Sequence, residues 1–354
     1  MRVSQAILAV VPMAMAAPSQ QLDARDSQDV HVTFQASRLT SEAAIEVWNK
    51  DQTEILGQSC TGSIDSGIFQ NTPIAFTTDK NGAGTVTVGP KTYKIHEDVD
   101  VSGGISCGRV TSPAEIMIKC MIPLSGGLAA RLEPLHKRDL ANCFPKSGPV
   151  ELAEVMRGLE TAPTLDPDAL APATFEVPSN ATNDTEGLSD LERRQRVCEI
   201  VITDTVRVGD GNPHQNPLNI QVSIPLDCNK NKECTVGYQH QQTFGIGWSV
   251  SASIAGWISG GFAVEKSTST GMYAECGGEE GDYIAVWMSV GQTAYTVQDR
   301  RRPNCGVTNY GPSRIVWSPN KNNRNSYYYC VTGRKYVRNV GDRWLDKTGR
   351  AGGP

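Results

Sequence analysis

The sequence predicts a mainly β protein, with two small disulfide-bonded, β-sandwich-like domains joined by a flexible acidic linker that holds one short helix. Three observations predict this class. Segments in which apolar and polar residues alternate recur in both halves of the chain. The chain has ten cysteines, which fall into two groups of even number. An acidic, proline-rich stretch lies between the two cysteine-bearing segments.

The N-terminus has the parts of a secretion signal. Arg2 supplies a positive charge, an apolar run covers residues 6–15, and the small residues that precede a cleavage end at Ala16. The run is too short to cross a bilayer, and Pro12 interrupts it. We therefore expect residues 1–16 to be a cleaved signal peptide, rather than a buried helix, and the mature protein to be secreted and extracellular.

The cysteines indicate an oxidising destination, and each half of the chain has an even number of them, so each can close its own bridges. The early cysteines are Cys60, Cys107, Cys120 and Cys143, and the late ones are Cys198, Cys228, Cys234, Cys276, Cys305 and Cys330. No Cys-x-x-Cys pair occurs and histidine is scarce, which argues against a zinc site. We expect neither a metal nor a cofactor.

The front domain, residues 17–138, is expected to be built from strands. Residues 30–35 alternate between apolar and polar side chains, as a half-buried strand does, and a turn at 79–84 precedes the next strand. The segments around Cys107 and Cys120 can form a hairpin closed by a bridge between these two residues. That pairing leaves Cys60 for Cys143.

The linker, residues 139–194, begins with a predicted helix. Ser147 is a suitable cap, Pro149 suits the first turn, and the apolar residues Leu152, Val155, Met156 and Leu159 share a face. Residues 139–197 contain 11 Asp or Glu and 5 Lys or Arg, a net charge of −6, and later prolines prevent long regular structure. Asn180 and Asn183 lie in glycosylation sequons, so a flexible glycosylated linker or propeptide is expected.

Two dibasic pairs mark the ends of this linker. Lys137 and Arg138 precede it, and Arg193 and Arg194 end it, where a protease can reach extended backbone. We expect a kexin-like protease to cut at both pairs; the alternative is that both are ordinary solvated residues. A Cys60–Cys143 bridge would keep the middle piece attached after the first cut.

The rear domain, residues 195–354, contains an amphipathic glycine- and serine-rich segment. Its large apolar residues lie at alternating positions and include Phe244, Ile246, Trp248, Val250, Ile254, Ile258 and Phe262. Each is worth ~1.5–3 kcal/mol when removed from water, so this stripe must be buried. It can face the core of its own domain. It can also face lipid, because residues 244–254 are long enough for a tilted strand to cross a bilayer.

This segment resembles the insertion hairpin of aerolysin-type pore-forming toxins, which is also amphipathic and rich in Ser and Thr. The resemblance implies a companion strand, for which 281–287 followed by 293–297 is the candidate. It also implies a homo-oligomer on the membrane, whose hairpins close into a barrel. A bridge between the flanking Cys234 and Cys276 would restrict such an extension.

The C-terminal residues 300–354 are strongly basic, with 12 Lys or Arg and 2 Asp, a net charge of +10. The expected basic surface consists of Arg300, Arg301, Arg302, Arg314, Arg334, Lys335 and Arg338. Together with interleaved tyrosines and tryptophans, it would attract anionic lipid, phosphate or acidic polysaccharide. The alternative is a solvated basic face with the aromatic residues in the core. The acidic linker is expected to mask this tail in the uncut chain.

An enzyme is a weaker hypothesis. Residues 311–317 look loosely like the arginine-bearing strand of secreted fungal guanyl-specific ribonucleases, but the next strand, 327–330, lacks the histidine that would act as general acid. We therefore assign no catalytic residue and expect the protein not to be an enzyme.

The order of parts resembles that of fungal killer-toxin and secreted-effector precursors. The resemblance implies a secreted, proteolytically processed, disulfide-rich toxin or virulence effector that acts on target cells. Its expected partners are the processing protease and a target membrane or cell-wall polysaccharide, and no nucleic acid is expected. The alternative function is that of a non-catalytic carbohydrate- or cell-wall-binding protein.

Overall fold

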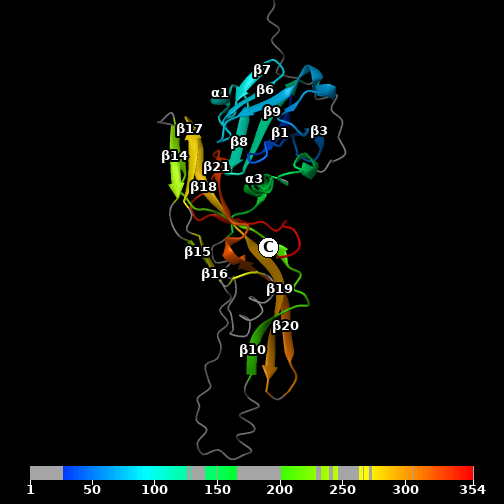
Figure 1. Ribbon diagram of the computed structural model, residues 1–354, viewed down its shortest axis with the longest axis vertical. Helices are drawn as coiled ribbons and strands as arrows, with labels where there is room; N and C mark the ends of the chain where they lie inside the picture. Colours follow the sequence, from blue (N-terminus) through cyan, green and yellow to red (C-terminus); the bar gives the residue numbers. More distant parts are fainter. Residues whose placement is uncertain are drawn as a thin grey trace, which may run out of the picture.

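The structure is a computed structural model, and it confirms a mainly β, disulfide-bonded fold (Figure 1). It describes residues 27–125, 128, 140–148, 150–165, 201–228, 233–238, 242–245, 263–265, 267–270, 273–304 and 306–353. We call residues 27–125 the front region and residues 201–353 the rear region.

The front strands are β1 (Ser27–Ser37), β2 (Ala43–Trp48), β3 (Ile55–Ser59), β4 (Ser63–Ile64), β5 (Ile74–Thr78), β6 (Gly84–Val88), β7 (Lys91–Lys94), β8 (Ser106–Thr111) and β9 (Glu115–Ser125). The rear strands are β10 (Val201–Arg207), β11 (His214–Gln215), β12 (Leu218–Gln221), β13 (Leu226–Asp227), β14 (Glu233–Tyr238), β15 (Gln242–Gly245), β16 (Ser267–Thr270), β17 (Ala274–Glu279), β18 (Tyr283–Val290), β19 (Gln292–Pro303), β20 (Asn309–Pro319), β21 (Tyr327–Thr332) and β22 (Arg343–Leu345). The helical segments are α1 (Val99–Ser102), α3 (Leu152–Thr161) and the short 3₁₀ turns η2 (Gly67–Asn71), η3 (Leu140–Cys143) and η5 (Lys321–Asn323).

One ten-stranded sheet runs through both regions. Its order is β22-β12-β18-β21-β8-β9-β1-β2-β3, with β13 beside β18. The two regions meet where β21 pairs with β8, with Val331 opposite Val110. The sequence analysis placed these strands in two separate domains, whereas their backbone hydrogen bonds join them in one sheet. Without this pairing, β8 and β21 would each present an unpaired edge.

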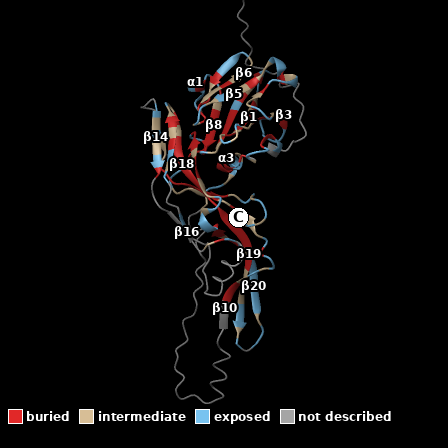
Figure 2. Cartoon of the chain, in the orientation of Figure 1, coloured by how far each residue is buried: buried red, intermediate tan, exposed pale blue. Residues whose placement is uncertain are grey.

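The front region is a two-layer sandwich. The four-stranded sheet β4-β5-β6-β7 shares an apolar core with the front half of the large sheet, and Phe34 of β1 stacks on Phe76 of β5 at 5.1 Å between ring centroids. Val30, Val32 and Phe34 are buried, which confirms the strand predicted from the alternation at residues 30–35. Figure 2 shows buried residues along the strands of this region.

Helix α3 forms where the sequence predicts it, but it belongs to the core rather than to a flexible linker. Its apolar face is buried against front residues such as Met117 and rear residues such as Trp287 and Trp344. Figure 1 shows the helix between the two regions. Residues 150–165 of the predicted linker therefore bind the two regions together, and residues 166–194 lie outside the described part of the chain.

The predicted cap of this helix is wrong. The Ser147 hydroxyl donates to Glu42 at 2.8 Å, and the helix begins after Glu151, which makes no side-chain cap. The carboxylate of Glu115, on β9, accepts instead from the backbone N–H groups of Glu151 and Leu152 at 3.3 and 3.2 Å. A strand residue thus satisfies the free N–H groups of the first turn, which fixes the helix to the sheet.

Four disulfides are described: Cys60–Cys143, Cys107–Cys120, Cys228–Cys234 and Cys276–Cys330. The first two confirm the pairing expected for the front half. Cys234 and Cys276 bind other partners, so no bridge between them restricts the amphipathic segment. Cys198 and Cys305 lie outside the described residues.

The rear region also contains smaller sheets. Strands β10, β11 and β20 pair with the long strand β19, β14 pairs with β17, and β15 pairs with β16. Figure 1 shows β10, β19 and β20 extending away from the front sandwich. None of the helices in the described part of the chain is long and apolar enough to span a bilayer.

Candidate functional site

Strands β10, β19 and β20 form a thin three-stranded projection that we call the arm. Its base is buried, because Ala294, Tyr295 and Val297 of β19 are fully enclosed. Its outer part is open: Tyr310 is 58% exposed and Ile315 is 49% exposed. Figure 2 shows this change from buried to exposed along the arm. The outer arm therefore presents apolar side chains that the fold itself does not cover.

A bulge places these apolar residues on one face. Ile315 lies opposite Thr296 and Tyr310 lies opposite Arg300, while the register shifts between Gln298 and Arg300. Tyr310 and Ile315 are five positions apart, so a regular strand would send them to opposite faces. The shift adds one residue to β20, and both side chains consequently share the face of Arg300 and Arg302.

Arginines surround this face, and most are paired. Arg300 donates to both carboxylate oxygens of Asp204 at 2.9 and 2.5 Å, and Arg302 lies 3.4 Å from the same carboxylate. The hydrogen bond from Arg300 is the main cause that lowers the pKa of Asp204. On the opposite face Arg314 donates to Asp299 at 2.7 Å.

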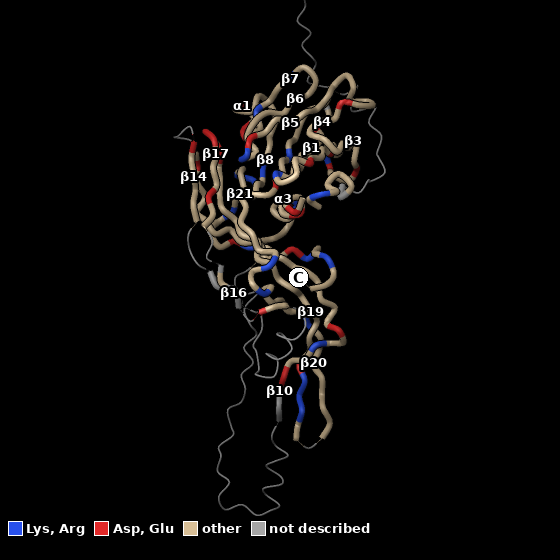
Figure 3. The backbone as a smooth tube through the Cα atoms, viewed as in Figure 1, with Lys and Arg blue, Asp and Glu red and all other residues tan. Residues whose placement is uncertain are grey.

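The charge of the arm is nevertheless positive. Residues 201–207 and 292–319 contain five Arg and two Asp, a net charge of +3. Arg301 is exposed and forms no ion pair with any described residue. Figure 3 shows the run of basic residues along this part of β19.

The predicted membrane hairpin begins beside the arm. Gly245 pairs with Ser267 and Gln242 with Thr270, so β15 and β16 bring both ends of the amphipathic segment together. Both strands contact β20, and Val264 forms a bridge with Asn320 just beyond it. Phe244 lies in β15, and residues 263–265 are described. The remaining residues of the predicted stripe lie outside the described residues: Ile246, Trp248, Val250, Ile254, Ile258 and Phe262.

The companion strand proposed for this hairpin is wrong. Residues 283–290 form β18, which pairs with β12, β13 and β21 inside the large sheet. Trp287 at its centre is fully buried. Residues 293–297 lie in β19, paired with β11 and β20. The alternation in these segments reflects the core of the protein.

The predicted basic surface is mostly paired within the molecule. Arg334 donates to Asp227 at 2.5 Å and lies over the Tyr283 ring, and Lys335 is 3.4 Å from Glu160. Arg338 donates to the carbonyl oxygens of Leu159 and Ala162, at the end of α3. The aromatic residues are also mostly internal: Tyr328, Tyr329, Tyr336 and Trp344 are buried. Within the predicted basic surface, Arg300 and Arg302 share a face with the exposed Tyr310 and Ile315.

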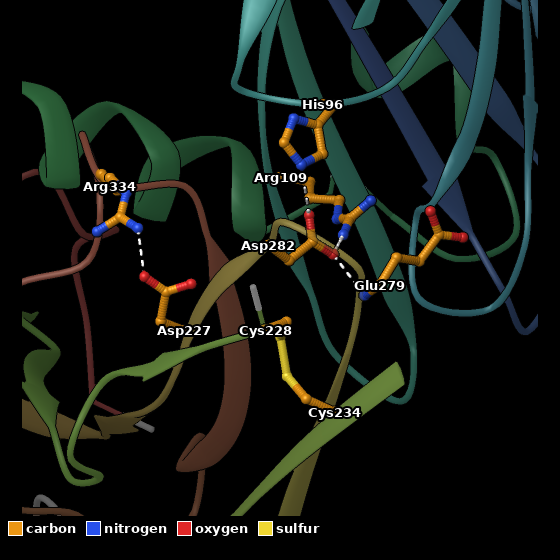
Figure 4. The surroundings of a disulfide bond; sticks show 8 residues. All are labelled: His96, Arg109, Asp227, Cys228, Cys234, Glu279, Asp282 and Arg334. Atoms are coloured by element: carbon orange, nitrogen blue, oxygen red, sulfur yellow. Dashed lines mark hydrogen bonds and ion pairs between the residues drawn. A yellow bond between two sulfur atoms is a disulfide. The ribbon is translucent and has the colours of Figure 1, made fainter. Parts of the chain in front are cut away.

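A second polar site, which the sequence did not indicate, joins the two regions. We call His96, Arg109 and Asp282 the junction cluster (Figure 4). Arg109, on front strand β8, donates to Asp282, in the turn before rear strand β18, and both side chains are almost completely buried. Asp282 also accepts from the backbone N–H of Glu279 at 2.7 Å. An ion pair removed from water in this way depends on both partners.

His96 completes the junction cluster. Its Nδ1 accepts from the backbone N–H of Asp98 at 3.0 Å, which leaves the ring proton on Nε2, 3.7 Å from the carboxylate of Asp282. Gly281 makes this approach feasible, because a Cβ there would lie 2.9 Å from Nε2. The sequence analysis interpreted residues 96–98 only as a polar turn.

A third polar group surrounds the side chain of Lys119. Its Nζ donates to Glu160 of α3 at 2.5 Å, and Glu160 also accepts from the Tyr336 hydroxyl at 3.1 Å. Burial acts to raise the pKa of Glu160, but the hydrogen bonds from Lys119 and Tyr336 and the charges of Lys119 and Lys335 together outweigh it, so the pKa is lowered. Burial and the charge of Lys119 lower the pKa of the nearby His31. Glu160 therefore links a front lysine to the rear residues Lys335 and Tyr336.

Among the described residues, no three His, Cys, Asp or Glu side chains are grouped so as to hold a metal ion. The two strands on which the resemblance to ribonucleases was based, β20 and β21, belong to different sheets.

The predicted processing and modification residues cannot be placed on this framework. Those that lie outside the described residues are Ala16, Lys137, Arg138, Asn180, Asn183, Arg193 and Arg194.

Comparison with protein-family models, with characterised proteins and with solved structures gives no match to this chain.

Proposed function

We propose that this chain is the precursor of a secreted, disulfide-bonded toxin or effector that acts on the membranes of target cells without catalysis. The observation that carries the proposal is the pairing of Gly245 with Ser267. The two ends of the amphipathic segment lie opposite each other in one antiparallel ladder, as the two ends of a hairpin do, and this ladder contacts β20. The four described disulfides are compatible with an extracellular site of action.

The sequence of the segment supports a role in lipid. Large apolar residues alternate with Gly and Ser from Phe244 to Ile254, which gives a strand one lipid-compatible face and one small polar face. A single hairpin cannot satisfy its edge hydrogen bonds in a bilayer, so several copies must close into a barrel. We therefore propose that the active form is an oligomer that assembles on the membrane.

The wall-binding alternative receives less support. Recognition of a polysaccharide uses exposed aromatic rings, and the tyrosines and tryptophans of the C-terminal region are mostly buried, whereas Tyr310 stands alone on the arm. Outside the arm, an anionic polymer would also meet Arg334 and Lys335 already paired with Asp227 and Glu160.

Release of a trapped dye from liposomes tests this function. The secreted full chain is expected to release dye, and Trp248→Asp is expected to abolish the release, because a charge on the lipid face opposes insertion. Ile224→Asp is the matched control: it introduces the same charge at an apolar residue that is 73% exposed and lies outside residues 243–264 of the sequence. Absence of leakage by the wild-type protein, or equal leakage by Trp248→Asp, would contradict the proposal.

Cleavage at the two dibasic pairs is part of the same proposal. The contacts of α3 change what we expect to happen to the middle piece after cleavage. Cuts at Lys137-Arg138 and Arg193-Arg194 would divide the chain into three pieces, but the middle piece carries α3 and Cys143. We propose that this piece stays in the mature particle and that the cuts free the ends of the pieces without separating them.

A further inference from the structure

We propose that the outer arm face, made of Arg302, Tyr310 and Ile315, together with Val307 in the loop before β20, is the surface with which the protein first adsorbs to anionic lipid headgroups. This inference rests on the proposed function, because it names the lipid class and the surface that would deliver the amphipathic segment to a membrane. The arm is distinct from that segment, so its role can be tested separately.

The first argument is the concentration of exposed apolar residues. Ten large apolar residues of the described chain are exposed, and Val307, Tyr310 and Ile315 lie within one stretch of β20 and the loop before it. Val307, at 79%, has the largest exposed fraction of the ten. Several exposed apolar residues at one projecting end mark a candidate interaction site.

The second argument is the arrangement that the bulge produces. The shift between Gln298 and Arg300 puts Tyr310 and Ile315 on the face of Arg302, rather than on opposite faces. A tyrosine with an apolar ring and a polar hydroxyl suits the boundary between headgroups and acyl chains. An arginine beside it can remain at the level of the phosphates, as long basic side chains do at membrane interfaces.

The third argument is charge. The arm carries a net charge of +3, the side chain of Arg302 is 44% exposed, and Arg301 at the same end has no ion pair among the described residues. The whole chain has a formal net charge of −5, so the arm differs in sign from the molecule that carries it. An anionic surface would therefore attract this end and orient the protein with the arm toward it.

The arm is connected to the amphipathic segment through β20. The ladder of β15 and β16 contacts β20, and Glu265 beyond the amphipathic segment binds the backbone of Pro319 at 2.9 Å. Strand β20 therefore connects the outer arm face to the base of the arm, where the amphipathic segment joins the described part of the chain.

Vesicle co-sedimentation tests the proposal, with the secreted full chain and vesicles of phosphatidylcholine alone or mixed with phosphatidylserine. We expect binding to the anionic vesicles that weakens as salt is raised. The double variant Tyr310→Ser/Ile315→Ser should reduce this binding on the order of tenfold. Arg302→Glu should weaken it by a smaller factor and reduce its salt dependence, because Arg302 lies on the face of Tyr310 and Ile315. Ile224→Ser/Val340→Ser, which also removes two exposed apolar residues, should bind as the wild type does.

Tethering separates this proposal from the proposed function. When a His-tagged chain is held on vesicles by a nickel-chelating lipid, Tyr310→Ser/Ile315→Ser should release dye as the wild type does, whereas Trp248→Asp should not. If neither the Tyr310→Ser/Ile315→Ser variant nor the arginine variant binds anionic vesicles less than the wild type does, the role of the arm is overturned, whatever the leakage shows. The proposal would also be overturned if the Tyr310→Ser/Ile315→Ser variant binds vesicles as the wild type does but no longer self-associates in light scattering. The face would then be a contact between copies of the chain.

Discussion

The junction between the front and rear regions and the outer arm are built from similar residue types, yet they use them in opposite ways. At the junction, Arg109 and Asp282 are buried against each other and α3 fills the space between two sets of strands. In the arm, Arg301 is exposed and Tyr310 has no apolar cover. The comparison assigns stability to the junction and interaction with other molecules to the arm. Each prediction below compares a change at the junction with its counterpart in the arm.

The largest effect is expected from the junction cluster. Asp282→Ala should lower the free energy of unfolding by about 3–5 kcal/mol, because it leaves the charge of Arg109 buried and unpaired. Asp299→Ala removes the partner of Arg314 in the arm, where both side chains are partly exposed, and should cost at most about 1 kcal/mol. Urea denaturation measures both. Asp282→Asn, which keeps the shape and removes only the charge, serves if the alanine variant is not secreted. Equal losses in junction and arm would contradict the assignment.

A smaller effect is expected from added bulk on α3. A Cβ on Gly158 would lie 2.1 Å from the Trp344 ring, so Gly158→Ala should destabilise by about 1–3 kcal/mol. Up to about 1 kcal/mol of that loss is offset because alanine favours a helix over glycine. In the arm, a Cβ on Gly311 meets its nearest neighbour at an ordinary 3.6 Å, and Gly311→Ala should change stability little. Thermal unfolding of both variants decides whether the helix is packed as described.

Acidification should weaken the junction before it affects the arm. His31 and Glu160 both have lowered pKa values, so the unfolded chain binds their protons more readily than the folded one. Stability is therefore lost as the pH falls below about 6.5 for His31, and below about 4.5 for Glu160. The lowered pKa of Asp204 in the arm matters only below about 3.8.

The histidine can be isolated by mutation. His31→Gln should reduce the drop in Tm between pH 7.5 and 5.5 by roughly 1–3 °C. If the drop in Tm is unchanged in His31→Gln, the protonation of His31 does not contribute to the loss of stability on acidification.

The smallest effect is expected from processing. After cleavage at both dibasic pairs, the three pieces should co-elute in gel filtration, and Tm should change little. A non-reducing gel should show the middle piece attached to the front piece through Cys60–Cys143. Elution of the middle piece by itself without reductant would show instead that residues 139–194 are a propeptide that is discarded.

Local features of the fold were predictable from the sequence. The alternation of Val30, Val32 and Phe34, the hairpin between Cys107 and Cys120, and the apolar face of α3 are all patterns within a few residues of each other. Such patterns report which side of an element is buried. They do not report which element covers it.

The joining of the two regions was not predictable in this way. The pairing of Val110 with Val331 spans most of the chain, and nothing in either strand names its partner. A buried charge leaves no periodic signal either, so Arg109 and Asp282 resembled ordinary surface residues. The basic C-terminus shows the same limit of sequence patterns. Arg300, Arg301 and Arg334 look alike in the sequence, but Arg300 and Arg334 have carboxylate partners in the structure.

The account depends most on the claim that the molecule meets a membrane through the arm and the adjoining amphipathic segment, while the junction stays closed. Hydrogen exchange of the full chain, with and without anionic vesicles, tests this claim directly. The prediction is slower exchange in the outer halves of β19 and β20 and in residues 243–264, with no change in β8, β21 or α3. Protection of the junction strands with an unaffected arm would contradict it.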